Sequence, residues 1–251
     1  MKGEPLQPDI DLVVERGAIP QYKLISDGWY CRNDTDGQQV MFSQENAKLF
    51  AIQYGQNDRS AKIIVEKPTK KVMQLGIQFG FLLAAHQKYV GVHGVTLLCA
   101  NEIVILSAPS GTGKTTLAQL LETYCDAVVI NGDFALLNPT EDGVVFEPTP
   151  FCGSTTRSLN HRLRVNRIVF LGQAKENAWR ELDGREAMKR FMSNAFIPEW
   201  NNGIQKTVQE NILRCITALK ISAYDFAPTQ KAAEIFLKHM ENESNCSVRS
   251  E

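Results

Sequence analysis

The sequence lacks the features by which metal-thiolate, nucleic-acid-binding and membrane proteins are usually recognised. Its six cysteines include no Cys-x-x-Cys pair, and its four histidines form no cluster at the spacing of zinc ligands. The net charge is −1, which provides no general attraction for nucleic acid or for an anionic membrane. We therefore expect no structural zinc site and no nucleic-acid partner.

Long apolar runs are also missing. The longest apolar stretch, at residues 77–85, is far too short to cross a bilayer. The N-terminal region carries Asp, Glu and Arg where a secretory signal would need an apolar segment. These absences predict a cytoplasmic protein with free thiols and no membrane partner.

The chain does have the composition of an ordinary globular protein. Of its 251 residues, 43% are hydrophobic and 22% are charged, which is enough apolar material for a sizeable core. A β-rich pattern fills the first part, with strands expected at 11–14, 39–42 and 61–65 between turn signals. We predict a small β-rich lobe over residues 1–70, a catalytic core over 71–241 and a polar, flexible tail over 242–251.

The expected core alternates strands and helices, which indicates an α/β fold with a mixed sheet and flanking helices. A buried helix is predicted at 72–87, followed by strands at 95–99 and 103–106 with a tight turn between them. Asp183 is a good N-cap for one of the later helices. The remaining predictions are a helix at 115–124, strands at 126–130, 144–146 and 167–171, and helices at 184–194, 205–219 and 229–240.

The most informative segment is Ala108-Pro109-Ser110-Gly111-Thr112-Gly113-Lys114-Thr115-Thr116, which lies between a predicted strand and a predicted helix. Consecutive N–H groups of such a loop can wrap a phosphate, and the helix N-terminus adds its positive end. Lys114 can place a charge on the β- and γ-phosphates, and the Thr115 hydroxyl can bind Mg²⁺. The predicted nucleotide-binding residues are Ser110, Gly111, Thr112, Gly113, Lys114, Thr115 and Thr116.

One position departs from the phosphate-loop (Walker A) pattern. That pattern asks for Gly at position 108, where this chain has Ala108. Ala cannot adopt a positive φ without strain, whereas Gly can. The alternative interpretation of the segment is a chance Gly-Lys-Thr in a surface turn, which its strand and helix context disfavours.

Taken together, the segments at 91–95, 108–116 and 129–133 resemble the catalytic core of HPr kinase/phosphorylase. They also resemble ATP-dependent phosphoenolpyruvate carboxykinase, which shares that nucleotide-binding core. The likeness is greatest to short HPr-kinase-related proteins, and it covers roughly residues 72–237. The first 70 residues carry no motif that matches the family. The resemblance implies a P-loop kinase fold and, since such proteins often assemble, a homo-oligomer.

The resemblance also implies catalytic roles for Asp133, His93 and Lys114. Asp133 stands where the related kinases have the acidic residue that receives the proton of the acceptor hydroxyl, and with Thr115 it would hold Mg²⁺. The family usually has two consecutive acids there, whereas this chain has Gly132-Asp133, so Glu147 is a candidate for the second role. A turn-forming Asp and a buried structural His remain the alternatives for Asp133 and His93.

Weaker candidates surround these residues. The loop at 151–156 could bend over the site, and arginines could clamp a transferring phosphoryl group, although charged runs are more often solvated. The candidate arginines are Arg157, Arg162, Arg164 and Arg167. Lys175 and Trp179 are interpreted as surface or local packing residues, and Trp200 as an aromatic anchor of its loop.

These patterns predict a nucleotide-dependent kinase that uses Mg²⁺ and transfers the γ-phosphate of ATP to a Ser- or Thr-type hydroxyl. The acceptor would be a small protein, a peptide or a metabolite, and GTP stays open as the donor. Carboxykinase-like decarboxylation is disfavoured because the chain is short and lacks a second acidic metal cluster. A non-catalytic nucleotide-binding module of a peptide-modification or biosynthetic pathway is the remaining alternative, which Ala108 and the single Asp133 keep open.

Overall fold

The computed structural model describes residues 10–19, 21–26, 29–34, 37–44, 47–55, 59–149, 151, 161–198 and 200–247. The chain divides into two compact units. The first comprises Met1–Tyr89 and Ile197–Gln209, and the second comprises Val90–Phe196 and Glu210–Glu251. The boundary therefore differs from the one predicted at residue 70. The helix that follows that residue packs on the N-terminal sheet and so belongs to the first unit.

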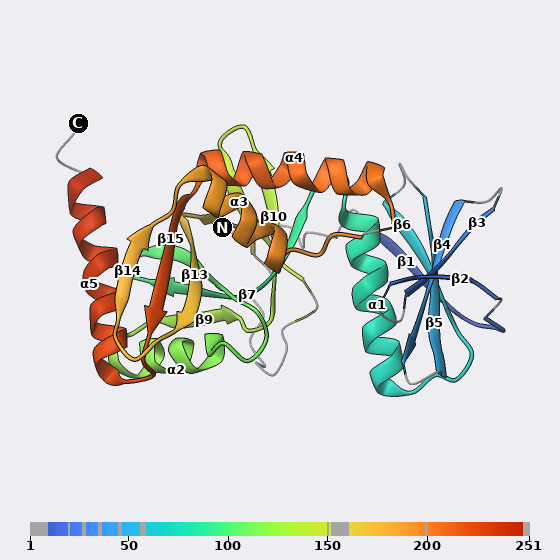
Figure 1. Cartoon of the computed structure of the whole chain (residues 1–251), viewed down its shortest axis with the longest axis horizontal. Coiled ribbons are helices and arrows are strands. Elements are labelled where there is room, and N and C mark those ends of the chain that lie inside the picture. The colour runs from blue at the N-terminus through green and yellow to red at the C-terminus, as the bar shows by residue number, and fades with distance from the viewer. Residues whose placement is uncertain are drawn as a thin grey trace. The chain divides into compact units, whose positions relative to one another are not determined.

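The first unit is a sheet covered by one helix, which agrees with the predicted β-rich lobe (Figure 1). The strand order is β1-β6-β5-β4-β3-β2, with β1 parallel to β6 and the other pairs antiparallel. Thr69 caps α1 by accepting a hydrogen bond from the Val72 N–H. The elements are β1 (Asp11–Arg16), β2 (Lys23–Ser26), β3 (Trp29–Asp34), β4 (Gly37–Gln44), β5 (Ala47–Tyr54), β6 (Ser60–Val65) and α1 (Lys70–Ala85).

Aromatic side chains gather in this unit. Trp200, on the segment that returns to the unit, lies 4.8 Å from Trp29 between ring centroids. Its indole N–H donates to the hydroxyl of Tyr54 at 2.8 Å. The predicted role of Trp200 as an aromatic anchor is therefore confirmed.

The second unit is built on a mixed sheet in the order β12-β11-β10-β7-β8-β13-β15-β14, with β9 also paired to β7. Strands β8, β13 and β15 are parallel to one another. The predicted α/β class is thus confirmed. The strands are β7 (Val90–Cys99), β8 (Glu102–Ser107), β9 (Val128–Asn131), β10 (Phe134–Thr140), β11 (Gly143–Glu147), β12 (Leu163–Val165), β13 (Arg167–Gln173), β14 (Ala178–Glu181) and β15 (Lys220–Phe226).

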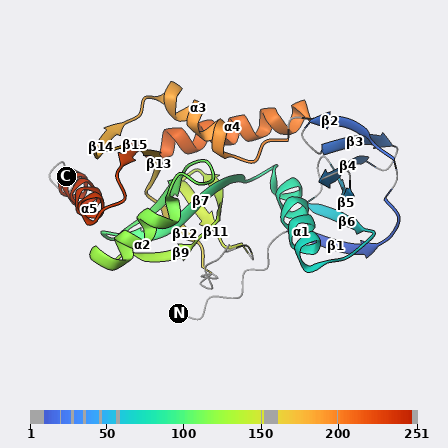
Figure 2. The ribbon, with the colours of Figure 1, turned by 60° about the horizontal axis from the view of Figure 1, so that its bottom comes forward.

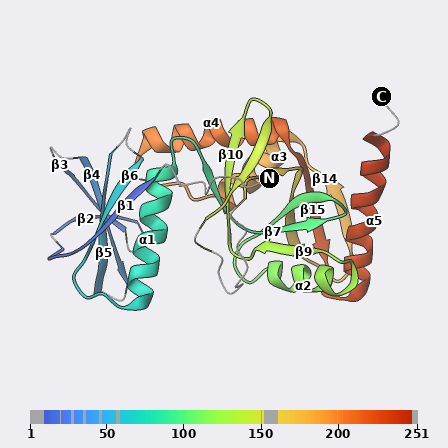
Figure 3. The same cartoon turned by 180° about the vertical axis from the view of Figure 1, so that it is seen from behind.

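Helices cover both faces of the parallel strands (Figures 2 and 3). Side chains alternate along β13, so Leu171 packs in the core with α2 and α5, whereas Phe170 meets Phe191 of α3 edge to face. The helices are α2 (Lys114–Tyr124), α3 (Gly184–Asn194), α4 (Asn202–Ala218) and α5 (Gln230–Ser247), and the boundary between the two units falls within α4. Because α5 continues to Ser247, the tail predicted to begin at residue 242 is helical in its first part.

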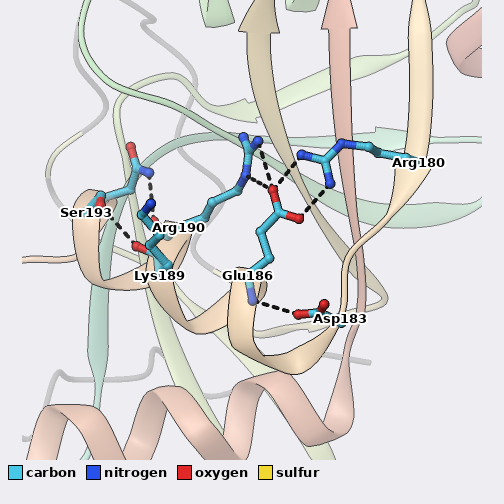
Figure 4. A network of polar contacts seen from close by, with 7 residues as sticks. Arg180, Asp183, Glu186, Lys189, Arg190 and Ser193 are labelled. Atoms are coloured by element: carbon cyan, nitrogen blue, oxygen red, sulfur yellow. Dashed lines mark hydrogen bonds and ion pairs between the residues drawn. The ribbon is translucent and has the colours of Figure 1, made fainter.

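The start of α3 is fixed by charge and by its cap (Figure 4). The Asp183 carboxylate accepts a hydrogen bond from the Glu186 N–H at 2.8 Å, which confirms the predicted N-cap. Both terminal nitrogens of Arg180, in β14, donate hydrogen bonds to the Glu186 carboxylate. Arg190, one turn further along α3, also donates to this carboxylate. The hydrogen bonds from Arg180 lower the pKa of Glu186 to about 2. These contacts join α3 to β14.

Candidate active site

The loop between β8 and α2 places two of its glycines at positive φ. It leaves the carboxyl end of β8 at Ser107, and α2 begins at Lys114. Gly111 has a φ of 81° and Gly113 a φ of 102°, a region that glycine enters without strain. Ala108 is not among the described non-glycine residues with a positive φ, so the missing glycine introduces no backbone strain there.

The first turn of α2 is open to a ligand. Gly113 is the N-cap, and it supplies no side-chain hydrogen bond to the N–H groups of that turn. A Cβ on Gly111 would meet nothing within 4 Å, so the backbone there faces open space. Unsatisfied N–H groups at a helix N-terminus favour an anion. This end of α2 is therefore suited to phosphate.

Lys114 lies folded against the loop. Its ammonium group donates to the carbonyl oxygens of Ala108 at 2.7 Å and Pro109 at 3.1 Å. The side chain is buried. Burial lowers the pKa of Lys114, and the nearby carboxylate of Asp133 acts in the opposite direction. The ammonium group therefore lies against the backbone of the loop. It also interacts electrostatically with Asp133, the residue predicted to act as the base.

Two successive threonines at the start of α2 border different spaces. Thr116 borders a cavity of about 510 Å³ together with the ends of β13 and β15. Thr115 borders a smaller cavity of about 150 Å³ together with Gly132, the neighbour of Asp133. Successive helix positions point about 100° apart, which accounts for the separation. The predicted metal ligand therefore lies on the Asp133 side of the helix.

Asp133 stands where the chain passes from β9 to β10. Both strands pair with β7, and the residues between them interrupt the ladder opposite Gly94. The Asn131 side-chain oxygen accepts hydrogen bonds from the N–H groups of Asp133 and Phe134, each at 3.1 Å. Its amide nitrogen donates to the Phe151 carbonyl at 2.7 Å. Asn131 thereby fixes the turn that carries the Asp133 carboxylate.

His93 lies directly beside this turn. It pairs with Phe134 across the ladder, and its Nδ1 is 3.7 Å from the nearer carboxylate oxygen of Asp133. The Ser107 hydroxyl donates to the His93 carbonyl at 3.0 Å, which joins the strand to the start of the loop. Burial lowers the pKa of His93, as does the charge of Lys114, while Asp133 opposes both. The lowered pKa favours the neutral form of the imidazole, which is influenced by both a cation and a carboxylate.

Gly94 allows β7 and β8 to come close at this point. A Cβ at Gly94 would lie 2.9 Å from the carbonyl oxygen of Leu106, closer than real Cβ contacts allow. Gly94 pairs with Ser107, the last residue before the loop, and its N–H donates to the Asp133 carbonyl at 3.0 Å. One glycine therefore brings together the His93 strand, the loop and the Asp133 turn.

The weaker candidates do not join this cluster. Glu147, suggested as a second acid, is buried and accepts hydrogen bonds from Asn138 and Arg162, so it serves as a structural partner. Arg167 is fully buried and donates to Glu102 at the far end of β8 from the loop. The suggested clamp roles of Arg162 and Arg167 are therefore not supported. Arg164 lies beside Gly143. Arg157 and residues 152–156 of the predicted loop lie outside the described residues.

Sequence reasoning missed the residues at the ends of the parallel strands. Gln173 is the last residue of β13, and its side-chain N–H group donates a hydrogen bond to the Gly111 carbonyl at 3.2 Å. Lys175 and Phe226 border the larger cavity. Lys175 is exposed, in agreement with its interpretation as a surface or local packing residue, and it also borders this cavity. The sequence did offer a signal for these residues, since ligands of open α/β sheets bind at the carboxyl ends of the strands. The strand before Lys175 was predicted, but its partner β15 was not.

Metal-ligand clusters and membrane-spanning helices are both absent from the described part of the chain. There, no group of three or more His, Cys, Asp or Glu side chains is placed to hold a metal ion. No described helix combines the length and the apolar character needed to span a membrane.

Comparison with known proteins gives a distant likeness among solved structures. No family model matches the chain, and no curated protein matches it. Among solved structures, the Hpr(Ser) kinase/phosphatase from Coxiella burnetii is similar, with a TM-score of 0.38 and 9% sequence identity. The match covers 62% of this chain and 97% of that one. Likeness at this level does not establish a shared activity, so function is inferred below from the residues of this chain.

Proposed function

We propose that this chain is a kinase that transfers the γ-phosphate of Mg-bound ATP to a Ser- or Thr-type hydroxyl of a small protein, peptide or metabolite. The observation that carries the proposal is that three features lie close to the carboxyl end of β8. These are the uncapped start of α2, the buried Lys114 and the Asp133–His93 pair. The sequence resemblance to HPr-kinase-related proteins supports the same reaction.

The residues present fit a magnesium nucleotide. Thr115 and Asp133 offer hydroxyl and carboxylate oxygens, the hard donors that Mg²⁺ prefers, and they would hold it together with phosphate oxygens. Bound in this way, Mg²⁺ would offset the negative charge of the phosphates. The open backbone at Gly111 and the N–H groups of α2 suit the phosphates themselves.

The protein residues divide the chemistry among them. Lys114 places its positive charge at the phosphates and stabilises the charge that develops during transfer. Asp133 orients the acceptor hydroxyl and takes its proton as the oxygen bonds to the γ-phosphorus and the bond to the bridging oxygen breaks. ADP leaves as the second product. His93, neutral beside Asp133, positions that carboxylate.

The test is transfer of label from γ-labelled ATP into a panel of acceptors. The panel contains free serine, a peptide that ends in serine and a small carrier protein. We expect labelled acceptor with the wild type, none with Lys114→Ala, and wild-type amounts with Lys231→Ala, which removes an exposed lysine from α5. Nucleotide binding without label in any acceptor, with GTP tried as well, would instead favour the non-catalytic nucleotide-binding module.

A further inference from the structure

The smaller cavity, of about 150 Å³, has no assigned occupant. One wall is a stripe of α2, whose four lining residues recur at the spacing that places side chains on one face of a helix. These residues are Thr115, Ala118, Gln119 and Glu122. The other wall consists of Val95 of β7, Val129 of β9 and Gly132, which follows β9. The cavity is therefore formed by the second unit alone.

The two ends of this cavity differ in chemistry. At one end are Thr115 and Gly132, the residue before Asp133. At the other end is Glu122, whose carboxylate accepts a hydrogen bond from the Val129 N–H at 3.3 Å. The helix from Thr115 to Glu122 rises by about 10 Å, and the chain from Val129 to Gly132 covers a similar distance. The carboxylate therefore stands about 10 Å from the end at which the proposed chemistry takes place.

The volume and the lining of the cavity suit a long, positively charged side chain. A cavity of about 150 Å³ can hold a group the size of benzene, which is comparable to a lysine side chain. Val95, Ala118 and Val129 are buried and apolar, so they suit the methylene stem of such a side chain. The side-chain oxygens of Gln119 and Glu122 can accept hydrogen bonds from its cationic head. A carboxylate accepts several hydrogen bonds, so the one from Val129 leaves capacity for a ligand.

The length of the cavity excludes the smallest acceptors. The hydroxyl and the amino group of free serine lie on neighbouring carbon atoms, too close together to reach both Asp133 and Glu122. In a peptide, each extended residue adds about 3.5 Å, so a basic side chain about one or two positions from the serine can span the distance. Resting on the proposed kinase function, we propose that this cavity binds a lysine or arginine side chain of the acceptor, which is therefore a basic peptide segment.

The experiment measures phosphoryl transfer to peptides that contain a single serine and differ at one neighbouring position. That position carries lysine, methionine (similar in length but uncharged) or glutamate, and it is placed in turn at each of the two positions on either side of the serine. For at least one placement, we expect the wild type to prefer the lysine peptide to the methionine peptide by about tenfold or more in kcat/KM. This is the effect of one charge-assisted hydrogen bond.

Variants of Glu122 connect the preference to the cavity. Glu122→Gln keeps a side-chain oxygen for the Val129 N–H but removes the charge, so the preference should fall below about twofold while the affinity for Mg-ATP stays unchanged. Glu122→Lys should instead prefer the glutamate peptide. Glu141→Gln is the matched control, since Glu141 is exposed in the turn between β10 and β11, outside the cavity lining. It should keep the wild-type preference.

Three results would overturn the basic-side-chain site and leave the kinase proposal standing. They are equal transfer to the lysine and methionine peptides at every placement, transfer to free serine as efficient as to any peptide, and a lysine preference that persists in Glu122→Gln.

Failure of the underlying function gives a different result, because binding of the same peptides can be measured by fluorescence anisotropy in the presence of Mg-ADP. Tighter binding of the lysine peptide without any transfer of label would contradict the kinase proposal and support the cavity as a site for a basic side chain. A protein that neither binds these peptides nor phosphorylates any acceptor would contradict both proposals.

Discussion

At the scale of single residues, burial sets the chemical state of the polar groups in this chain. Lys114, His93 and His86 all have lowered pKa values, and in each case removal from water is the main cause. Desolvation disfavours the charged form of a base. His86 differs from the other two because it is the C-cap of α1 in the first unit, whereas Lys114 and His93 belong to the second unit. It therefore reports the effect of burial on folding alone.

His86 should make the protein less stable in mild acid. Its pKa is lowered from 6.5 by burial, with an opposing hydrogen bond to the Leu83 carbonyl. Well above pH 6.5 the imidazole is neutral in both the folded and the unfolded chain, so its protonation takes nothing from the free energy of unfolding. As the pH falls through and below that value, the unfolded chain takes up the proton first, and stability is lost.

Urea unfolding between about pH 8 and pH 5 measures this loss. The unfolding free energy of the wild type should fall more steeply than that of His86→Asn, which keeps a donor near Leu83 but cannot titrate. Other ionisable groups are shared by the two proteins and cancel in the difference. Parallel curves for the two proteins would mean that His86 is not held neutral by the fold.

At the scale of elements, the site depends on how closely β7, β8 and the β9–β10 turn pack. Gly94 lies between Ser107 and Asp133, and the backbone of Leu106 occupies the space a side chain would need. Backbone cannot move aside as readily as the end of a flexible side chain. A methyl group here must therefore separate two strands or displace the loop that follows β8.

Gly94→Ala should destabilise the protein by about 1–3 kcal/mol, the usual result of overpacking a tight core site. It should also weaken binding of Mg-ATP, because the strand pair that it disturbs carries both His93 and Ser107. Gly184→Ala provides the control, since a Cβ there, at the start of α3, meets nothing within 4 Å. The measurements are the unfolding free energy and nucleotide affinity. A Gly94→Ala protein with wild-type values for both would contradict the packing described.

Elements that are encoded locally could be predicted, whereas those defined by their neighbours could not. The helix at 184–194 was predicted with the observed bounds, because its Asp cap and its apolar spacing lie within the segment. The turn between β7 and β8 was also confirmed, with Ala100 and Asn101 both at positive φ. In contrast, β15 was missed. Its Ser222 and Asp225 interrupt an apolar pattern, and its pairing with β13 and β14 fixes it as a strand.

The residues of the candidate site also differ in whether their placement is encoded locally or by distant neighbours. Lys114, Gly111 and Gly113 belong to one local motif, so the sequence alone could locate the loop. Asp133 and His93 were singled out by resemblance, and their functional roles stay predictions. Gln173 and Lys175 could not be assigned, because Gln173 bonds to Gly111, 62 positions away, and Lys175 borders a cavity whose other side is the start of α2. Only the order of the strands places those residues around the loop.

At the scale of the whole molecule, the proposed nucleotide site belongs to the second unit alone. Its residues all fall within Val90–Phe196 and Glu210–Glu251. The first unit has a separate core of its own, to which the aromatic cluster of Trp29 and Trp200 contributes. Damage to that cluster should therefore affect stability without affecting the binding of nucleotide.

Trp200→Ala provides this test. Removing a partly buried indole should lower the unfolding free energy by about 2 kcal/mol, less than the loss for a fully buried one. Trp200→Phe should lose only about 1 kcal/mol, since it keeps a ring but not the hydrogen bond to Tyr54. Both variants, assayed well below their melting temperatures, should bind Mg-ATP with wild-type affinity. Weaker binding by a folded Trp200→Ala protein would place part of the nucleotide site in the first unit.

The most direct test of the kinase proposal is the ratio of phosphoryl transfer to nucleotide binding in Asp133→Asn. Asp142→Asn, an exposed carboxylate in the turn between β10 and β11, is the control. If Asp133 takes the proton of the acceptor, Asp133→Asn should bind nucleotide but transfer phosphate at a rate about 10²-fold or more below the wild type. The control should match the wild type. Transfer by Asp133→Asn at the wild-type rate, with the same acceptor, would contradict the assignment of Asp133 as the catalytic base.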